Sequence, residues 1–270
     1  MGRAFIFGLG YTGSRIADGL RARGWDVSGT GGGSPVAFDD AAAVEPLVAS
    51  ATHIISTIPP GSGLLDRYGA LLHDKWLGYI SSTGVYGDAG GAWVDESAPL
   101  NGRRADRIAE DRAWLALGAR VFRLPGIYGP GRSALDRVAS RTAHRVAVPG
   151  QMFSRVHVDD IVSGVIAGFD APAGAYNLAD DCPCGQNAVM ERAAGLLGVA
   201  PPPFVSLESL SVQARAFYAE NRRVANGKAK RMLGWKPAYP DFATGLRALS
   251  AISSPANATT PPAAASAVQR

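Results

Sequence analysis

Cysteine is scarce in this chain: its 270 residues include only Cys182 and Cys184, which Pro183 separates. Two thiols so close together are poor disulfide partners, and they do not complete a tetrahedral zinc site. The sequence therefore predicts no metal centre and favours a reducing compartment.

Long apolar runs are absent as well. No stretch approaches the ~18–20 residues that a membrane-spanning helix requires. The N-terminal residues MGRAFIFGLGYTG lack the long apolar segment and the small-residue cleavage site of a secretion signal. We therefore expect a cytoplasmic protein without a membrane partner.

An excess of acidic residues is also missing, because 27 Lys and Arg outnumber 23 Asp and Glu and give a net charge of +4. The basic residues are scattered in short pairs and form no aromatic-interleaved stripe, so we expect no nucleic-acid partner. A mildly positive surface would suit a phosphorylated ligand. Hydrophobic residues make up 47% of the chain, which excludes a wholly disordered protein.

The first half alternates short β-rich runs with helical segments, the pattern of a parallel sheet covered on both faces. We predict an α/β fold, a Rossmann-type doubly wound parallel sheet with a small, mostly helical C-terminal substrate lobe. The predicted strands span Arg3–Phe7, Trp25–Thr30, Val36–Phe38, His53–Ile58, Leu77–Ser82 and Arg120–Leu124. The predicted helices of this half span Thr12–Arg23, Leu64–Trp76 and Ile108–Leu117.

Beyond residue 125 the chain becomes rich in Gly and Pro. The domain prediction is a dinucleotide-binding domain over 1–170, with 125–156 partly on the substrate side, and a substrate-capping lobe over 171–250. The small, polar and Pro-rich end, 251–270, is expected to be disordered. Helices are predicted at Asp159–Phe169, Gln186–Leu197, Leu207–Tyr218, Lys228–Leu233 and Phe242–Leu249.

A glycine motif follows the first predicted strand, where residues 8–13 read GLGYTG and lead into an amphipathic helix. Gly8 permits a tight turn, Gly10 lets a diphosphate approach the backbone, and Gly13 lets the helix pack on the strand. The free amide groups of the helix N-terminus also attract a diphosphate. The motif predicts a binding site for NAD or NADP.

The choice between NAD and NADP depends on the end of the second strand, where residues 28–34 read SGTGGGS. No carboxylate stands there to hold the ribose 2′-hydroxyl of NAD, and no Arg stands there to hold a 2′-phosphate. Thr30 and Ser34, aided by Arg15, could cradle a phosphate. This loop favours NADP and excludes neither cofactor.

Three further motifs follow the glycine turn in order: ISSTGVYGD at 80–88, RLPGIYGPG at 123–131 and RVHVDDI at 155–161. Over residues 3–250 the chain resembles the extended and atypical branch of the short-chain dehydrogenase/reductase superfamily, the NAD-dependent epimerase/dehydratase-like proteins. The resemblance implies an NAD(P)-dependent oxidoreductase or epimerase that acts on a carbonyl or carbohydrate-like small molecule.

The resemblance also implies roles for individual residues. Ser82 would hold a substrate carbonyl, and Asp39 would contact the adenine. Tyr86 is a second catalytic candidate, although packing alone would also explain a tyrosine in a VYG element. The other expected cofactor contacts, including those from the turn and the second strand, are Tyr11, Thr12, Thr30, Thr57, Ile58, Pro59, Leu124 and Pro125. The residues expected to face the substrate are Thr83, Tyr128, Arg132 and His157, the last of which has a structural hydrogen-bonding role as its alternative.

One departure from the family pattern concerns the proton relay, a Tyr followed four residues later by a Lys. Our alignment places Arg103 at the Tyr position and Arg107 at the Lys position. An Arg does not deprotonate in proteins and cannot serve as a general base. The two arginines would instead hold an anionic substrate or effector, or they point to solvent from the start of a helix.

The missing relay leaves two functional hypotheses open. The first is an enzyme of atypical mechanism, in which Ser82 polarises a carbonyl and the proton comes from water, Tyr86 or the substrate. The alternative is a non-catalytic, regulatory or redox-sensing protein that binds NAD(P). In either case we expect a monomer or a homodimer.

Overall fold

The computed structural model describes residues 2–253. Its centre is a six-stranded sheet with the order β10-β6-β4-β3-β1-β2, in which every neighbouring pair is parallel. The Rossmann-type α/β fold class is therefore confirmed. The strands are β1 (Arg3–Phe7), β2 (Asp26–Thr30), β3 (His53–Ser56), β4 (Trp76–Ser82), β6 (Arg120–Leu124) and β10 (Gly174–Asn177).

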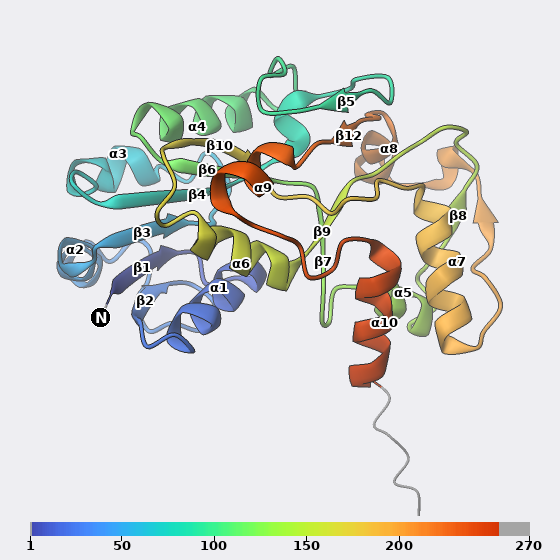
Figure 1. Cartoon of the computed structure of the whole chain (residues 1–270), viewed down its shortest axis with the longest axis horizontal. Helices are drawn as coiled ribbons and strands as arrows, with labels where there is room; N and C mark the ends of the chain where they lie inside the picture. Colours follow the sequence, from blue (N-terminus) through green and yellow to red (C-terminus); the bar gives the residue numbers. More distant parts are fainter. Residues whose placement is uncertain (1, 254–270) are drawn as a thin grey trace, which may run out of the picture.

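Helices cover both faces of the sheet (Figure 1). One face carries α1 (Tyr11–Arg21) and α6 (Val158–Ala167), and the other carries α2 (Ala41–Ser50), α3 (Leu64–Tyr68) and α4 (Ala105–Ala116). This arrangement follows from side chains that alternate along buried strands.

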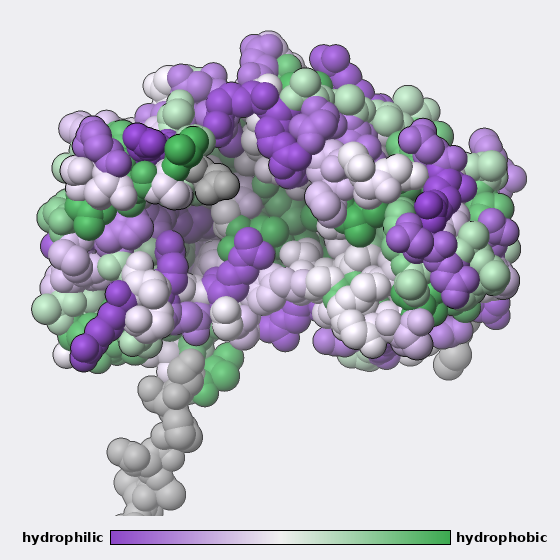
Figure 2. Space-filling view, turned by 180° about the vertical axis from the view of Figure 1, so that it is seen from behind, coloured by the Kyte–Doolittle hydropathy of each residue, from purple (hydrophilic) through white to green (hydrophobic). Residues whose placement is uncertain are grey.

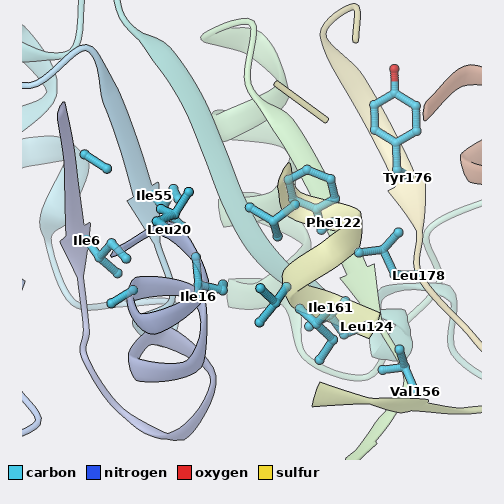
Figure 3. Packing of buried hydrophobic residues seen from close by; sticks show 14 of the residues in the cluster. Ile6, Ile16, Leu20, Ile55, Phe122, Leu124, Val156, Ile161, Tyr176 and Leu178 are labelled. Atoms are coloured by element: carbon cyan, nitrogen blue, oxygen red, sulfur yellow. The ribbon is translucent and has the colours of Figure 1, made fainter. Parts of the chain in front are cut away.

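The first strand shows the alternation directly. Ile6 belongs to the hydrophobic cluster under α1 and α6, whereas Phe5 and Phe7 belong to the cluster under α2, α3 and α4. Figure 3 shows the first cluster, in which Ile16 and Leu20 of α1 approach the strands. Burying each such side chain contributes about 1.5–3 kcal/mol. The two helix layers therefore hold the sheet, and with it the carboxyl ends of its strands, in a fixed position.

The C-terminal lobe packs around a separate hydrophobic cluster. Its main helices are α5 (Ala134–Ala139), α7 (Gln186–Leu197) and α10 (Phe242–Ser253). The parallel pair β7 (Gly126–Tyr128) and β9 (Arg155–His157) lies between this lobe and the sheet (Figure 1). The remaining elements are short: β5 (Trp93–Val94), β8 (Arg145–Val146), β11 (Phe204–Val205), β12 (Arg223–Val224), α8 (Val212–Tyr218) and α9 (Gly227–Leu233).

The strand prediction was wrong at one place and incomplete at another. Residues 36–38 form no strand, because Gly31, Gly32 and Gly33 all adopt positive φ and redirect the chain after β2. The sixth strand is instead β10, which pairs with β6 and lies beyond the predicted boundary at residue 170. Strand β10 has only four residues and none of them is β-branched, so the sequence contained little indication of a strand there.

Two helix predictions were too long. The helix predicted over Leu64–Trp76 ends at Tyr68 and continues only as a 3-10 turn over Gly69–Leu71, and Trp76 begins β4. The helix predicted over Leu207–Tyr218 is divided into a 3-10 turn at Leu207–Ser209 and α8.

The predicted disordered end falls mostly outside the described residues. Helix α10 extends to Ser253, and residues 254–270 lie outside the described residues. Within residues 2–253 no helix has the length and apolar character needed to cross a membrane.

Candidate active-site cleft

The turn between β1 and α1 has a tight backbone geometry. Gly8 adopts a φ of +96°, and a Cβ there would lie 2.6 Å from the Cγ2 of Ile58. A Cβ on Gly13 would lie 2.0 Å from the carbonyl oxygen of Gly8, so the helix can approach the turn only with glycine here.

Gly10 differs from these two glycines because a Cβ there would meet nothing within 4 Å. It is also the N-cap of α1, and no side chain caps the helix. The first amide groups of this 11-residue helix therefore have no side-chain cap, and the space beside Gly10 is open, which is the arrangement that a diphosphate requires. The turn thus fits a dinucleotide on its own geometry.

A cleft of about 460 Å³ extends from this turn along the carboxyl ends of the strands. It brings together residues from β1–α1, β3, β4 and β6 that are far apart in the sequence. Eight of the expected cofactor residues line it, namely Gly10, Tyr11, Thr12, Thr57, Ile58, Pro59, Leu124 and Pro125. Ser82 and Arg107 line it as well.

Thr30 and Asp39 lie elsewhere. Thr30 is buried, and its hydroxyl accepts a hydrogen bond from the amide of Gly8 at 3.3 Å, so it supports the turn from inside. Asp39 is exposed in a turn, and its carboxylate pairs with Arg67 at 2.9 Å. Neither side chain lines the cleft. The strand predicted over Val36–Phe38, which Asp39 would have followed, does not form.

Two more cavities continue the cleft toward the C-terminal lobe. A small one of about 160 Å³ is lined by Ser82, Thr83 and Arg103, and a large one of about 510 Å³ is lined by Tyr128 and Arg132. All three cavities share Gly126. Figure 2 shows the molecular surface hollowed near its middle, with hydrophobic and hydrophilic residues around the hollow.

Comparison with known proteins shows the family and the fold to which the chain belongs. No family model matches the chain. A solved structure of a functionally unknown conserved protein from Silicibacter pomeroyi has 35% identity and a TM-score of 0.84, with 94% of this chain and 99% of that chain covered. Protein YeeZ from Escherichia coli K12 is 29% identical over 89% of this chain and 97% of its own length.

Two solved structures with bound cofactors have the same fold at lower identity. MoeE5 in complex with UDP-glucose and NAD has 18% identity and a TM-score of 0.74, with 93% of this chain and 98% of that chain covered. Human SDR39U1 with NADPH has 16% identity and a TM-score of 0.72, with 92% and 99% covered.

The chain belongs to one family with the Silicibacter protein. Its fold is that of the NAD-dependent epimerase/dehydratase-like, extended short-chain dehydrogenases/reductases, as the glycine turn and the three later motifs predicted.

Arg103 and Arg107, the residues aligned with the missing relay, face two different cavities. Arg107 lines the cleft of the glycine turn, and no carboxylate of the described residues forms an ion pair with it. Arg103 lines the small cavity, where its Nε lies 2.6 Å from Glu220 Oε1 and its Nη2 donates to the carbonyl of Ala216 at 2.9 Å. Of the two, only Arg107 has a charge without a partner.

Glu220 was not predicted as a site residue. Its second carboxylate oxygen accepts from Arg222 at 2.6 Å, and hydrogen bonds from the two arginines, acting against the effect of burial, lower the pKa of this carboxyl. The contact between Arg103 and Glu220 spans 117 residues, so no local sequence signal could reveal it.

Ser82 has the geometry of a hydroxyl that can donate to a substrate. Its Oγ accepts a hydrogen bond from the amide of Gly84 at 3.1 Å, and it lines both the cleft and the small cavity. Among the described residues, no acceptor for its own proton is found. A hydroxyl in this state can polarise a carbonyl oxygen.

Tyr86 belongs to a buried network instead. Its hydroxyl donates to Asn177 Oδ1 at 2.7 Å and accepts from Arg123 at 3.1 Å, and burial raises its pKa. Arg123 also binds Asp111, whose other hydrogen-bond donor is Ser81. Tyr86 lines none of the three cavities, which favours the packing alternative.

His157 likewise lines none of the cavities. It caps α6, and its Nδ1 accepts from the amide of Asp159 at 3.2 Å, so a neutral ring carries its proton on Nε2. Burial lowers its pKa and favours the neutral form. These contacts favour the structural alternative for His157. No group of three or more His, Cys, Asp or Glu within residues 2–253 could hold a metal ion.

Proposed function

We propose that this protein is an NAD(P)-dependent oxidoreductase of atypical mechanism that acts on a carbonyl or carbohydrate-like small molecule. The observation that carries the proposal is the single cleft that joins the open helix N-terminus at Gly10 to the hydroxyl of Ser82. The cofactors bound to MoeE5 and to human SDR39U1 support a nicotinamide dinucleotide in this chain.

The residues of the cleft divide the work of holding the cofactor. The amides at the start of α1 would bind the diphosphate, and Thr57, Ile58 and Pro59 would line its path. Arg107 would donate hydrogen bonds to a phosphate or to ribose hydroxyls, because it lines the cleft and no described carboxylate forms an ion pair with it. When bound, a nicotinamide exchanges a hydride with a substrate carbon.

Ser82 would donate a hydrogen bond to the oxygen at which negative charge develops. The proton for that oxygen would come from water or the substrate, since Tyr86 is committed to Asn177 and Arg123. Arg103 cannot act as the acid or base of the missing relay, because arginine side chains do not deprotonate in proteins.

Turnover by Ser82 variants tests this proposal. We expect the wild-type protein to oxidise NADPH or NADH with at least one member of a panel of aldehydes, ketones and ketoses. Ser82→Ala should lower kcat by about 10²–10³. NADPH affinity should stay unchanged, and Ser82→Thr, which keeps a hydroxyl, should restore part of the rate. Wild-type rates in Ser82→Ala would remove Ser82 from the chemistry.

The second candidate function is a dinucleotide-binding regulatory protein without turnover. The observation that favours it is the ion pair with Glu220, which engages Arg103, the residue that our alignment places at the relay tyrosine position. Tight dinucleotide binding with no turnover across the whole panel would favour this candidate over the enzyme.

A further inference from the structure

The large cavity, which we call the chamber, lies between β7 and β9 on one side and α5, α7 and α10 on the other. Its volume of about 510 Å³ is that of a small-molecule site. Its wall combines arginines with large apolar groups, and each kind of side chain indicates one chemical property of the ligand.

Three arginines line the chamber: Arg132, Arg137 and Arg155. No carboxylate of residues 2–253 forms an ion pair with any of them. The chamber also contains the carboxylate of Asp136, whose Oδ2 accepts from the amide and the hydroxyl of Ser133 at 2.7 and 2.6 Å. The charge on this wall is therefore mainly positive.

Arg155 is held in place by neutral groups. It is buried, and it donates to the carbonyl oxygens of Phe153 and Cys184 and to the side-chain oxygen of Gln186 at 2.8 Å. Arg132 lies with its guanidinium carbon 5.5 Å from the ring centroid of Tyr11. Neither arrangement neutralises the charge.

Arg137 makes no side-chain hydrogen bond to any described residue. Arg137 is exposed, but desolvation by the surrounding atoms lowers its pKa from the usual value; Tyr218 opposes this effect and the charge of Arg155 adds to it. An anion beside the guanidinium groups of Arg137 and Arg155 would counteract this lowering of the pKa, because opposite charge stabilises the ionised form. The electrostatics of the chamber therefore match an anionic ligand.

The apolar part of the wall contains a stacked aromatic pair. The rings of Phe153 and Phe217 lie 4.6 Å apart between centroids, with planes only 7° from parallel. Phe217 is nevertheless 54% exposed, so much of this ring remains accessible. A flat ring from a ligand could extend the stack and cover it. Phe242, Leu246 and Val189 complete this apolar wall.

We propose that the chamber binds the non-reacting end of the substrate, and that the substrate is an organic anion with a flat apolar body. Its carboxylate or phosphate lies beside Arg137 and Arg155, and its ring lies on Phe217. This inference rests on the proposed function, because Gly126 lines both the chamber and the cavity of Ser82, and the reacting end of a ligand anchored in the chamber would have to reach that hydroxyl.

Calorimetric titration of the full chain with benzoate, phenyl phosphate and uncharged benzamide tests the proposal. At least one of the two anions should bind about tenfold or more tightly than benzamide. The tighter of the two anions identifies the charged group as carboxylate or phosphate. Benzamide binding as tightly as both anions would overturn the proposal.

Variants localise the binding. Arg137→Gln and Phe217→Ala should each weaken the preferred anion by about tenfold. The control, Arg192→Gln, removes an exposed arginine of α7 that does not line the chamber, and it should bind like the wild-type protein. Unchanged affinity in Arg137→Gln would overturn the proposal, and circular dichroism should show that each variant is folded.

NADPH titration of the same proteins separates the two proposals. Arg137 does not line the cofactor cleft, so Arg137→Gln should bind NADPH like the wild-type protein. Anion binding in the chamber without any dinucleotide binding would support the chamber as an anion site and contradict the proposed function. Dinucleotide binding without anion binding would contradict the chamber as an anion site and leave the proposed function standing.

Discussion

The sheet half and the C-terminal lobe of this molecule differ in how their arginines are paired. In the sheet half, Arg123 and Asp111 are almost fully buried and are joined to each other by two hydrogen bonds. In the lobe, Arg132 and Arg137 line an open chamber and pair with no described carboxylate. The comparison indicates that the sheet half uses charge to fix its own structure, whereas the lobe keeps charge available for a ligand.

Removing one partner of the buried pair should have the largest effect. Asp111→Ala leaves the guanidinium of Arg123 buried without a counter-charge and removes the acceptor of Ser81. We expect the free energy of unfolding to fall by about 3–5 kcal/mol, as measured by urea denaturation.

A pair in the lobe provides the matched control. Glu191 is half exposed and pairs with Arg145, which keeps its contacts to Pro202 and Phe204 without it. Glu191→Ala should cost less than about 1 kcal/mol. An equal decrease in the free energy of unfolding in Asp111→Ala and Glu191→Ala would contradict the difference between the two regions.

A pH-dependent effect is expected where the two regions meet, at Asp180 after β10. Burial, reinforced by Asp181 and Asp241 and opposed by Arg155, raises its pKa to about 8. Unfolded Asp has a pKa of about 3.9, so between these values the folded state keeps a proton that the unfolded state has lost. The contribution of Asp180 to stability is therefore greatest at low pH and falls as pH rises toward 8.

The isosteric variant Asp180→Asn should remove this dependence. The stability of the wild-type protein minus that of the variant should decrease as pH rises from about 5 to 8, by at most about 1.4 kcal/mol per pH unit. Denaturation at several pH values measures the difference. A difference that stays constant would show that Asp180 does not keep its proton in the folded protein.

The loop after β2 should yield a smaller, selective effect on the choice of cofactor. Thr30 is buried, so the informative position is Gly31, where φ is +77° and a Cβ meets no atom closer than 3.8 Å. Gly31→Asp should shift the preference from NADPH toward NADH by roughly tenfold, because its charge repels a 2′-phosphate. Gly31→Asn imposes the same backbone strain without the charge and serves as the control. The same shift in both variants would exclude an electrostatic cause.

The comparison also explains which parts of the fold could be predicted from the sequence. β1 and β6 were predicted with their observed bounds, because apolar runs that end in glycine or proline signal buried parallel strands. β10 was missed because its four residues resemble the Gly- and Pro-rich loops around it. Element type depends on local pattern, whereas this strand depends on pairing with β6.

The site divides in the same way. The residues of the glycine turn and of the strand ends could be predicted because their positions follow from the motif and the parallel sheet. The partner of Arg103, the buried position of Thr30 and the role of Arg137 could not, since each depends on contacts between distant segments. The sequence therefore predicted Tyr128 and Arg132 of the chamber but not the contacts that set the charge on its wall.

NADPH titration of Gly10→Val tests the central claim, a dinucleotide on the glycine turn, most directly. The backbone of Gly10 is extended, with φ −78° and ψ −160°, and its Cβ position is empty, so valine should fill the diphosphate space without unfolding the turn. Gly195→Val in α7 is the control, because a Cβ there also meets nothing within 4 Å. We expect the wild-type protein and Gly195→Val to bind NADPH alike and Gly10→Val to bind about 100-fold more weakly. Equal affinity in all three proteins would contradict the account.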